Sequence, residues 1–337
     1  MNPSNDRGVF VNEFWSGRKV LVTGGEGFIG SSLVEQLLAQ GAQVRVLAHY
    51  KPYASAGFLS DHLDDIEMIA GDVRDSGQVL DAAEGIDTIF HLAALIGIPY
   101  SYRAPHTYLE TNVLGTQNIV DAARRHEVRR VVHTSTSEVY GTAREVPISE
   151  AHPLQPQSPY SASKIAADMV ALSYFHSFDT PVSVCRPFNT FGPRQSTRAV
   201  IPAILHQLHS GAGEIAVGAL SPTRDFTYVE DTARGFMAIA ESERTVGQTL
   251  NLGTGKEISI RDLIDVLIEI TGSAASVTAE DSRQRPAGSE VHRLLSDNGR
   301  VRELTGWSPQ VSLREGLTRT SEWVESHPIA DPRRYSV

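Results

Sequence analysis

Short apolar runs alternate with amphipathic segments along the first half of the chain, and this alternation limits the possible folds most strongly. The runs are apolar throughout, which is typical of parallel strands buried on both faces. The segments between them repeat apolar residues at helical spacing. Together they predict an α/β fold of the Rossmann type, with a doubly wound parallel sheet. The expected strands are residues 19–23, 44–47, 66–70, 87–92, 130–135 and 182–186, and the expected helices are residues 28–40 (ended by Gly41), 76–84, 108–126 and 158–178.

The alternation loosens beyond Phe191, where turns rich in proline and glycine predict a smaller second lobe. A helix is expected at residues 199–209, a short strand at 214–217 and another helix at 260–270. Residues 249–252 are expected to rejoin the main sheet, so this C-terminal substrate lobe is discontinuous in sequence. The predicted division is a loose N-terminal arm (1–17), a cofactor-binding domain (18–190, rejoined by about 236–256), a substrate lobe (191–235 and 257–326) and a tail (327–337).

Composition excludes several functions for this chain of 337 residues. Its net charge of −10 disfavours nucleic acid as a partner, because phosphate backbones need excess Lys and Arg. No apolar run is long enough for a membrane span and no signal peptide is visible, so no membrane partner is expected. The single cysteine, Cys185, cannot form an internal disulfide, which fits the cytoplasm. The twelve histidines lack a metal-binding pattern, so no metal is expected.

Glycines at positions 24, 27 and 30 follow the first expected strand and lead into the first helix. Glycines allow the backbone to turn tightly and to approach a pyrophosphate, and the helix N-terminus faces its negative charge. Phe28 and Ile29 begin the helix beside this loop. The segment therefore predicts a dinucleotide-binding site, although its spacing is GxxGxxG and not GxGxxG.

The second strand does not end in the acidic residue that often holds the adenosine ribose of NAD. It runs into Ala48, His49, Tyr50 and Lys51, and His49 or Lys51 could pair with a 2′-phosphate. The choice between NAD and NADP therefore stays open. Asp72 could reach the adenine amino group or could simply form a turn.

Tyr160 and Lys164 are four residues apart on an expected helix, so they share one face. A nearby ammonium group favours the phenolate, so we expect Lys164 to lower the pKa of Tyr160. The pair would then be a base for an alcohol proton. The strand ending at Ser135 is followed by Thr136, Ser137 and Glu138, which can add hydroxyls and a carboxylate to the same site.

In combination, these motifs resemble the extended short-chain dehydrogenase/reductase family that modifies nucleotide sugars. The resemblance covers roughly residues 19–317 and rests on TGGEGFIG, GDVRD, HLAA, TNVLGTQN, TSTSEVYG, YSASK, RPFNTFGPRQ and RDFTYVEDTARG. Within this family the chain is most similar to nucleotide-activated N-acetylglucosamine 4,6-dehydratases of legionaminic-acid-type pathways. The stretches HLAALIGIPYSY, HPLQPQSPYSASK and LSPTRDFTYVEDTARGF carry that closer similarity.

The resemblance implies a role for each matched position. Tyr160 would be the base for the sugar 4-hydroxyl, and Thr136 would hydrogen-bond the oxygen of that hydroxyl. Lys164 would hold the nicotinamide ribose. The remaining cofactor residues would be Gly24, Gly27, Phe28, Ile29, Gly30, His49, Asp72, Val73, Leu92, Ala93, Ala94 and Asn112. The nucleotide-diphosphate sugar would be bound by Asn189, Arg194, Val200, Arg224 and Glu290. Relatives also pair the helices at 108–126 and 158–178 into a homodimer, although those apolar faces could equally belong to the core.

Glu138 bears on which reaction follows the first oxidation. A 4-keto sugar has an acidic C5 proton, and a carboxylate that removes it allows water to leave from C6. A pure 4-epimerase needs no such base. Glucose-type 4,6-dehydratases carry an Asp as acid where this chain has Ser137, and the Thr-Ser-Glu triplet also occurs in UDP-glucuronate decarboxylases. The sequence thus predicts a 4,6-dehydratase, with a decarboxylase, an epimerase or a non-catalytic NAD(P)-binding regulator as alternatives.

Overall fold

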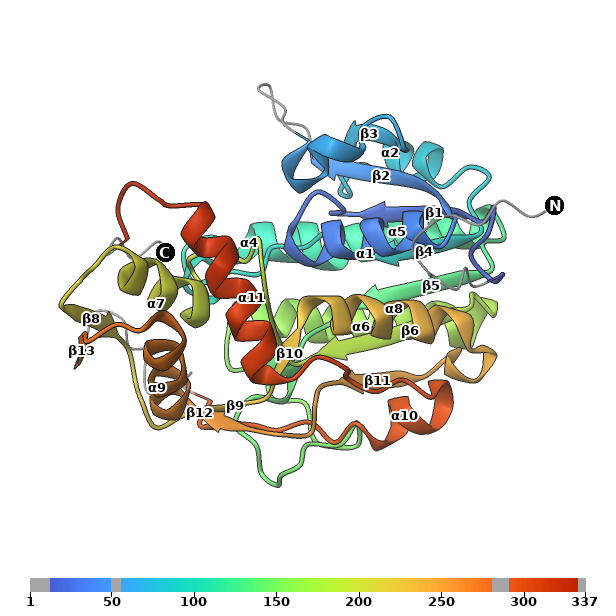
Figure 1. Cartoon of the computed structure of the whole chain (residues 1–337). Helices are drawn as coiled ribbons and strands as arrows, with labels where there is room; N and C mark the ends of the chain where they lie inside the picture. The colour runs from blue at the N-terminus through green and yellow to red at the C-terminus, as the bar shows by residue number, and fades with distance from the viewer. Residues whose placement is uncertain (1–12, 50–55, 281–290, 333–337) are drawn as a thin grey trace.

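The computed structural model describes residues 13–49, 56–280 and 291–332, and a seven-stranded sheet forms its centre (Figure 1). All neighbouring strands in this sheet are parallel. The order reverses between β1 and β4, which makes the sheet doubly wound as predicted. Across the sheet the strands are β3 (Ile66–Gly71), β2 (Gln43–His49), β1 (Lys19–Thr23), β4 (Thr88–His91), β5 (Arg130–Thr134), β6 (Val182–Pro187) and β11 (Thr249–Leu252).

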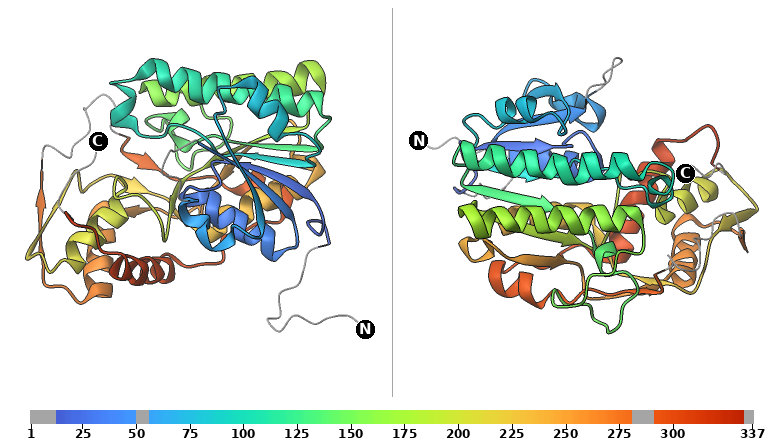
Figure 2. Two further views of the ribbon diagram at one scale, coloured as in Figure 1. Left: turned by 90° about the horizontal axis from the view of Figure 1, so that it is seen from above. Right: turned by 180° about the vertical axis from the view of Figure 1, so that it is seen from behind.

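Helices cover both faces of the sheet. α1 (Phe28–Ala39) and α8 (Val229–Glu241) pack together on one face, and α2 (Ser76–Ala82), α5 (Gly115–Arg125) and α6 (Pro159–Phe178) lie on the other (Figure 2). Strand β1 shows why its sequence is apolar throughout. Val20 and Val22 belong to the core under α1 and α8, whereas Leu21 belongs to the core under α2, α5 and α6. Each side of the strand is therefore buried.

A second lobe lies at the end of the sheet toward which the strands point (Figure 1). Its core joins α7 (Val200–His209), α9 (Ile260–Thr271) and α11 (Leu313–Ser326). Small sheets surround them, formed by β7 (Asn189–Phe191) with β10 (Phe226–Tyr228), by β8 (Glu214–Val217) with β13 (Ser276–Ala279), and by β9 (Thr223–Arg224) with β12 (Ile258–Ser259) and β14 (Arg293–Leu294). The remaining short helices are η1 (Gly57–His62), α3 (Ile98–Ser101), α4 (Pro105–Tyr108), η2 (Leu109–Leu114), η3 (Ser137–Tyr140), η4 (Glu243–Thr245) and α10 (Gly299–Thr305).

The helix expected at residues 108–126 is present, but it contains a π-helical segment, η2, between α4 and α5. Asn112 lies in this segment, and its buried side chain bonds to both backbone groups of Leu95 and to Ser163 Oγ. Wider π-type turns of this kind often occur at functional sites. Helix periodicity in the sequence gave no sign of this segment.

The N-terminal arm and the end of helix α1 differ from expectation. The arm predicted at residues 1–17 is not loose where it is described, because the Trp15 side chain is fully buried and its Nε1 donates to Glu241 Oε1 at 2.5 Å. Helix α1 ends one residue before the predicted stop, with Gln40 as its C-cap and Gly41 following at φ 81°. Among the described residues, no helix has the length and apolarity to cross a membrane.

Candidate active site

The loop from Gly24 to Gly30 joins β1 to α1 and has no room for side chains at two of its glycines. A Cβ at Gly30 would lie 2.2 Å from the Gly24 carbonyl oxygen, and one at Gly24 would lie 3.0 Å from the Ala93 nitrogen. The loop is therefore pressed against the end of β4. The N-cap of α1 is Gly27, which has no side chain to cap the first N–H groups, so they can bind an anion. This close-packed glycine turn fits the pyrophosphate of a dinucleotide.

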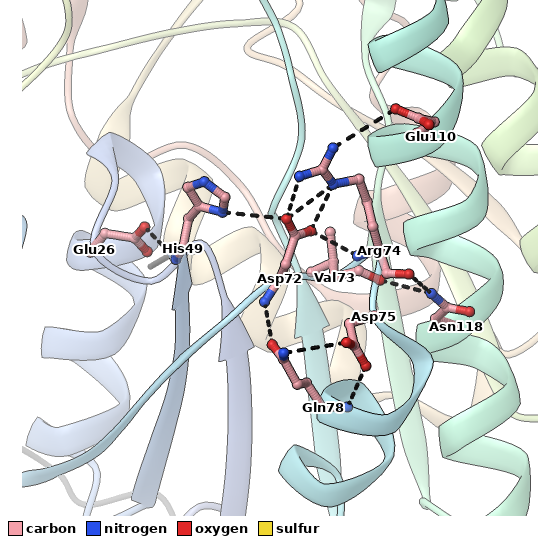
Figure 3. Close-up of polar contacts among 9 residues, drawn as sticks. All are labelled: Glu26, His49, Asp72, Val73, Arg74, Asp75, Gln78, Glu110 and Asn118. Atoms are coloured by element: carbon pink, nitrogen blue, oxygen red, sulfur yellow. Dashed lines mark hydrogen bonds and ion pairs between the residues drawn. The ribbon is translucent and has the colours of Figure 1, made fainter. Parts of the chain in front are cut away.

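Polar side chains surround the ends of β2 and β3 (Figure 3). His49 is the last residue of β2, and its N–H donates to Glu26 Oε1 at 3.4 Å. Asp72 follows β3, and its carboxylate accepts three hydrogen bonds from the Arg74 side chain. The bonds to Arg74 hold the pKa of Asp72 below its usual value against the effect of burial. The Asp72 carboxylate is thus already paired with Arg74, and the predicted contact with adenine would have to compete with this ion pair.

The neighbouring carbonyls are also fixed. Asn118 Nδ2 donates to the carbonyl oxygens of Val73 and Arg74, at 2.9 and 3.0 Å (Figure 3). These two hydrogen bonds connect the loop after β3 to helix α5. The backbone at Val73, next to Asp72, is therefore held in place.

His91, at the end of β4, links the glycine loop to α5. Thr116 donates to the Asn112 carbonyl oxygen at 2.6 Å, so its oxygen accepts from His91 Nε2 at 3.1 Å. The His91 Nδ1 then accepts from Thr23 Oγ1 at 2.8 Å, and this oxygen accepts from the Ala93 N–H at 3.1 Å. Burial keeps the pKa of His91 well below its usual value, so the ring is neutral. The chain of bonds fixes the backbone of Leu92, Ala93 and Ala94 beside the glycine loop.

The predicted catalytic side chains meet at the ends of β5 and α6. Thr136 is the N-cap of η3, and its Oγ1 accepts from the Glu138 N–H at 3.2 Å. The Tyr160 hydroxyl hydrogen-bonds the Thr136 side chain and feels the charge of Glu138. Lys164 Nζ donates to the Thr134 carbonyl oxygen at 2.6 Å. Ser137 is buried beside them.

The expected electrostatics of this group need correction. Burial raises the pKa of Tyr160 above its ordinary value, and the Glu138 charge adds to this, whereas the Thr136 hydrogen bond acts in the opposite direction. The prediction that Lys164 lowers the pKa of Tyr160 is therefore wrong for the protein alone, because the cost of burying a phenolate is larger. Burial also lowers the pKa of Lys164 to about 8, against the effect of the Asp168 carboxylate.

A buried ion pair that we did not predict lies beneath these residues. Asp168 is one helical turn after Lys164, and its Oδ2 accepts from Arg186 Nε and NH2 at 3.1 and 2.9 Å and from Ser135 Oγ at 2.8 Å. His133 Nε2 lies 3.3 Å from Asp168 Oδ1. The spacing of Lys164 and Asp168 by four residues was the one available signal in the sequence. The pairing with Arg186 depends on the neighbouring strand.

A cavity of about 310 Å³ lies in the second lobe beside α7 and β8, and three predicted substrate residues line it. These are Asn189, Val200 and Arg224. Arg198 lines it too and was missed, although it lies four residues after Arg194 in an arginine-containing loop. A cation-lined cavity of this size can hold a nucleotide diphosphate.

Of the other two predicted substrate residues, one lies elsewhere and one is outside the described residues. Arg194 has φ 72° and turns toward α1, where it donates to Glu35 Oε1 at 2.7 Å and to Ser31 Oγ at 3.1 Å. Arg194 therefore does not line this cavity, because its guanidinium group binds a carboxylate on α1. Glu290 lies outside the described residues, and so does Lys51. In the described ranges, no group of three or more His, Cys, Asp or Glu side chains could hold a metal ion.

Comparison with known proteins agrees with this geometry. The family model described as GDP-mannose 4,6 dehydratase matches residues 21–320. The chain belongs to the NAD-dependent epimerase/dehydratase family. This is the extended short-chain dehydrogenase/reductase family that the sequence resembles.

Relatives within the NAD-dependent epimerase/dehydratase family differ in reaction. A UDP-glucose 4-epimerase from Mycolicibacterium smegmatis is 37% identical, over 90% of this chain and 98% of its own. A dTDP-glucose 4,6-dehydratase from Actinoplanes sp. is 32% identical, over 92% of this chain and 98% of its own. Among solved structures, the dTDP-glucose 4,6-dehydratase DesIV from Streptomyces venezuelae was crystallised with NAD bound. It has a TM-score of 0.84 and 33% identity, covering 91% of this chain and 97% of its own. NAD is thus the cofactor that accompanies this fold in a structural neighbour.

Proposed function

We propose that this protein is a redox-neutral nucleotide-sugar 4,6-dehydratase, acting on UDP- or GDP-N-acetylglucosamine to give the 4-keto-6-deoxy sugar. The observation that carries the proposal is the position of Glu138. Its carboxylate is close enough to Tyr160 to raise the pKa of that hydroxyl, so a second proton-accepting group lies beside the base for the 4-hydroxyl. A 4,6-dehydratase needs both groups, whereas a 4-epimerase needs one.

The glycine loop, the backbone at Leu92 to Ala94 and Lys164 would hold NAD. When bound, NAD⁺ supplies a hydride acceptor for C4, a hydride donor for C6 and a positive charge. Because Tyr160 is protonated in the protein alone, we expect its pKa to fall when cofactor and substrate bind. The Lys164 ammonium and the Thr136 hydrogen bond favour the phenolate within the assembled site.

The side chains of this protein then have separate tasks in the proposed reaction. Tyr160 Oη accepts the proton of the sugar 4-hydroxyl as C4 becomes a ketone. The Glu138 carboxylate removes the C5 proton, which the ketone has made acidic, and the C6 hydroxyl leaves as water. Ser137 cannot supply the proton for that water as a carboxylic acid would. We infer that Glu138 delivers it after taking the C5 proton. When C6 receives hydride, C5 takes up one proton from solvent, and Tyr160 releases to solvent the proton of the 4-hydroxyl, so the protons balance. The sugar has then lost one water in total.

The cavity lined by Asn189, Val200 and Arg224 supports a nucleotide-diphosphate substrate. Guanidinium groups bind diphosphate oxygens through paired donors, and Arg224 offers such a group at the cavity wall. Support for an N-acetylated sugar comes from the sequence, in the stretches around residues 91–102 and 152–164. No described contact selects the base, so both UDP and GDP sugars are to be tested.

The test is product analysis with UDP- and GDP-N-acetylglucosamine and no added reductant. A 4,6-dehydratase gives a product lighter by one water molecule, with a methyl doublet in its proton NMR spectrum. An unchanged C6 hydroxymethyl group with both substrates would refute the proposal.

Two observations favour a second reaction, 4-epimerisation. The 37% identical relative is a UDP-glucose 4-epimerase, and Ser137 lacks the carboxylic acid of glucose-type dehydratases. The same assay detects this alternative as an inverted C4 centre with no loss of mass. A UDP-glucuronate substrate in the panel would reveal decarboxylation as carbon dioxide release.

We also infer a cytoplasmic homodimer that pairs the α5 and α6 face. Large apolar side chains on η2 and α6 are exposed, including Leu109, Leu114, Met169 and Phe178. No described element covers α5 and α6 on the outer side (Figure 2). The buried free thiol of Cys185 suits a reducing compartment. Light scattering after size-exclusion chromatography tests the assembly, and Met169→Glu should give monomers.

A further inference from the structure

Glu26, a residue of the glycine loop, reaches the end of the neighbouring strand β2. Its Oε1 accepts the His49 N–H at 3.4 Å (Figure 3). Its Oε2 is buried and has no hydrogen-bond partner in the part of the chain that the structure describes. A buried carboxylate oxygen without a donor is costly, so this oxygen is suited to receive a donor from a ligand.

The backbone of Glu26 is held from the opposite side. The Phe58 N–H donates to the Glu26 carbonyl oxygen at 3.4 Å. A Cβ at Gly57 would lie 2.5 Å from the same oxygen, so only a glycine fits there without a shift. Glu26 is thus fixed between β2 and the η1 segment. The carboxylate stands where the second strand of many NAD-binding proteins ends in an acidic residue, which this chain lacks.

The charges near this oxygen oppose a phosphate group. The Arg74 guanidinium group bonds to Asp72 at 2.6 Å and lies 3.8 Å from Glu110 (Figure 3). His49 Nδ1 is 3.7 Å from Asp72 Oδ2. The guanidinium group and the histidine ring drawn there are therefore already faced by carboxylates. A 2′-phosphate here would meet the Glu26 charge, and among the described residues of Figure 3 it would have to displace Asp72 to pair with Arg74.

We propose that Glu26 selects NAD over NADP, by accepting a hydrogen bond from the 2′-hydroxyl of the adenosine ribose and by repelling a 2′-phosphate. The residue supplies from the glycine loop the carboxylate that β2 does not provide. This inference concerns the cofactor alone. It is tested independently of the proposed sugar reaction, because the test needs no sugar substrate.

The test is calorimetric titration of wild-type protein and Glu26→Gln with NAD⁺, NADP⁺ and 2′-deoxy-NAD⁺. Gln keeps the size of the side chain and removes its charge. A hydrogen bond to a charged group is worth about 1.5–3 kcal/mol and one to a neutral group about 0.5–1.5 kcal/mol, so NAD⁺ should bind the variant roughly 5- to 10-fold more weakly. Binding of NADP⁺ should be equal or tighter, and that of 2′-deoxy-NAD⁺ should be unchanged.

The control is Glu67→Gln, which removes the same charge from the adjacent strand β3. Glu67 is largely exposed and pairs with Arg45 at 2.7 Å. It should leave the NAD⁺ to NADP⁺ ratio as in wild type. If Glu26→Gln weakens NAD⁺ and NADP⁺ by the same factor, the proposal is wrong.

The wild-type protein also provides a test that needs no variant. Adenosine 2′,5′-bisphosphate and 5′-AMP differ only in the 2′-phosphate. We expect 5′-AMP to bind at least about tenfold more tightly, from the same hydrogen-bond estimate. Equal affinity for the two ligands would overturn the proposal even if the variant failed to fold.

Discussion

Replacing Asp168 by Asn should destabilise the protein strongly, because it removes the negative charge at the centre of a buried cluster. The Asp168 side chain is fully buried, and Arg186, Ser135 and His133 contact its oxygens. Burial acts to raise the pKa of Asp168, but His133 and the Arg186 charge together hold it below the usual value, so the group is ionised. Asn has nearly the same shape and no charge.

The expected loss of unfolding free energy is about 3–5 kcal/mol. This is the range found when one partner of a buried ion pair is removed and the other is left without a counterion. Here two cations are affected. Arg186 loses its carboxylate, and Lys164 loses the charge that counteracts the effect of burial on its pKa of about 8. A smaller fraction of Lys164 should then be an ammonium at neutral pH, so activity should fall in addition to stability.

Urea unfolding followed by circular dichroism measures the first effect, and the pH dependence of turnover measures the second. The matched control is Asp121→Asn on the surface of α5, where the carboxylate pairs with Arg124 and Arg125 at 3.2 and 2.7 Å. Exposed pairs contribute roughly 0–1 kcal/mol, so this variant should unfold almost like wild type. A loss of less than about 1 kcal/mol for Asp168→Asn would refute the reasoning, because the buried pair would then behave like an exposed one.

Three other outcomes follow from the site. Glu138→Gln should keep oxidation at C4 and slow water loss by about 10²–10⁴-fold, whereas Tyr160→Phe should stop both. Reductive trapping with borodeuteride should therefore label C4 in the first variant only, and equal labelling would contradict the division of tasks. Because the pKa of Lys164 is about 8 when folded and 10.5 when unfolded, the unfolded chain binds more protons between these values. Unfolding free energy from Lys164 should thus rise with pH across this window, by up to about 1.4 kcal/mol per pH unit. The difference between wild type and Lys164→Met in urea titrations at several pH values checks the sign, and a falling difference would contradict it. Gly30→Ala would place a Cβ 2.2 Å from the Gly24 carbonyl oxygen, so it should cost about 1–3 kcal/mol and weaken NAD⁺ binding. Thermal melting and calorimetry measure both, and wild-type values for both would show that the loop has room.

The sequence predicted the sheet and the proximity of the candidate catalytic side chains because both depend on regular geometry. Parallel strands place their carboxyl ends along one edge, so residues following β1, β4 and β5 must meet there. Spacing by four residues placed Tyr160 and Lys164 on one face of α6 in the same way. These inferences needed only periodicity and strand order.

Other features depend on which side chains face one another, and periodicity carries no information about that. Arg194 turns toward Glu35 because its backbone adopts a left-handed conformation. The pKa of Tyr160 depends on how deeply neighbouring elements bury it. The reach of Glu26 to His49 depends on how closely the glycine loop packs against β2. Each of these was wrongly predicted or not predicted at all.

The position of β11 at the edge of the sheet has a consequence for synthesis and truncation. This strand pairs with β6, yet about 60 residues separate them, and these include α7 and the small strands β7 to β10. A nascent chain that ends before Thr249 therefore exposes the unpaired backbone of β6, and exposed strand edges favour aggregation. Stable fragments of the sheet alone should be hard to obtain by cutting the chain after β6. The strand also connects the two parts directly, because only residues 253–257 separate β11 from β12 of the second lobe, so a shift of β12 acts on an edge strand of the central sheet.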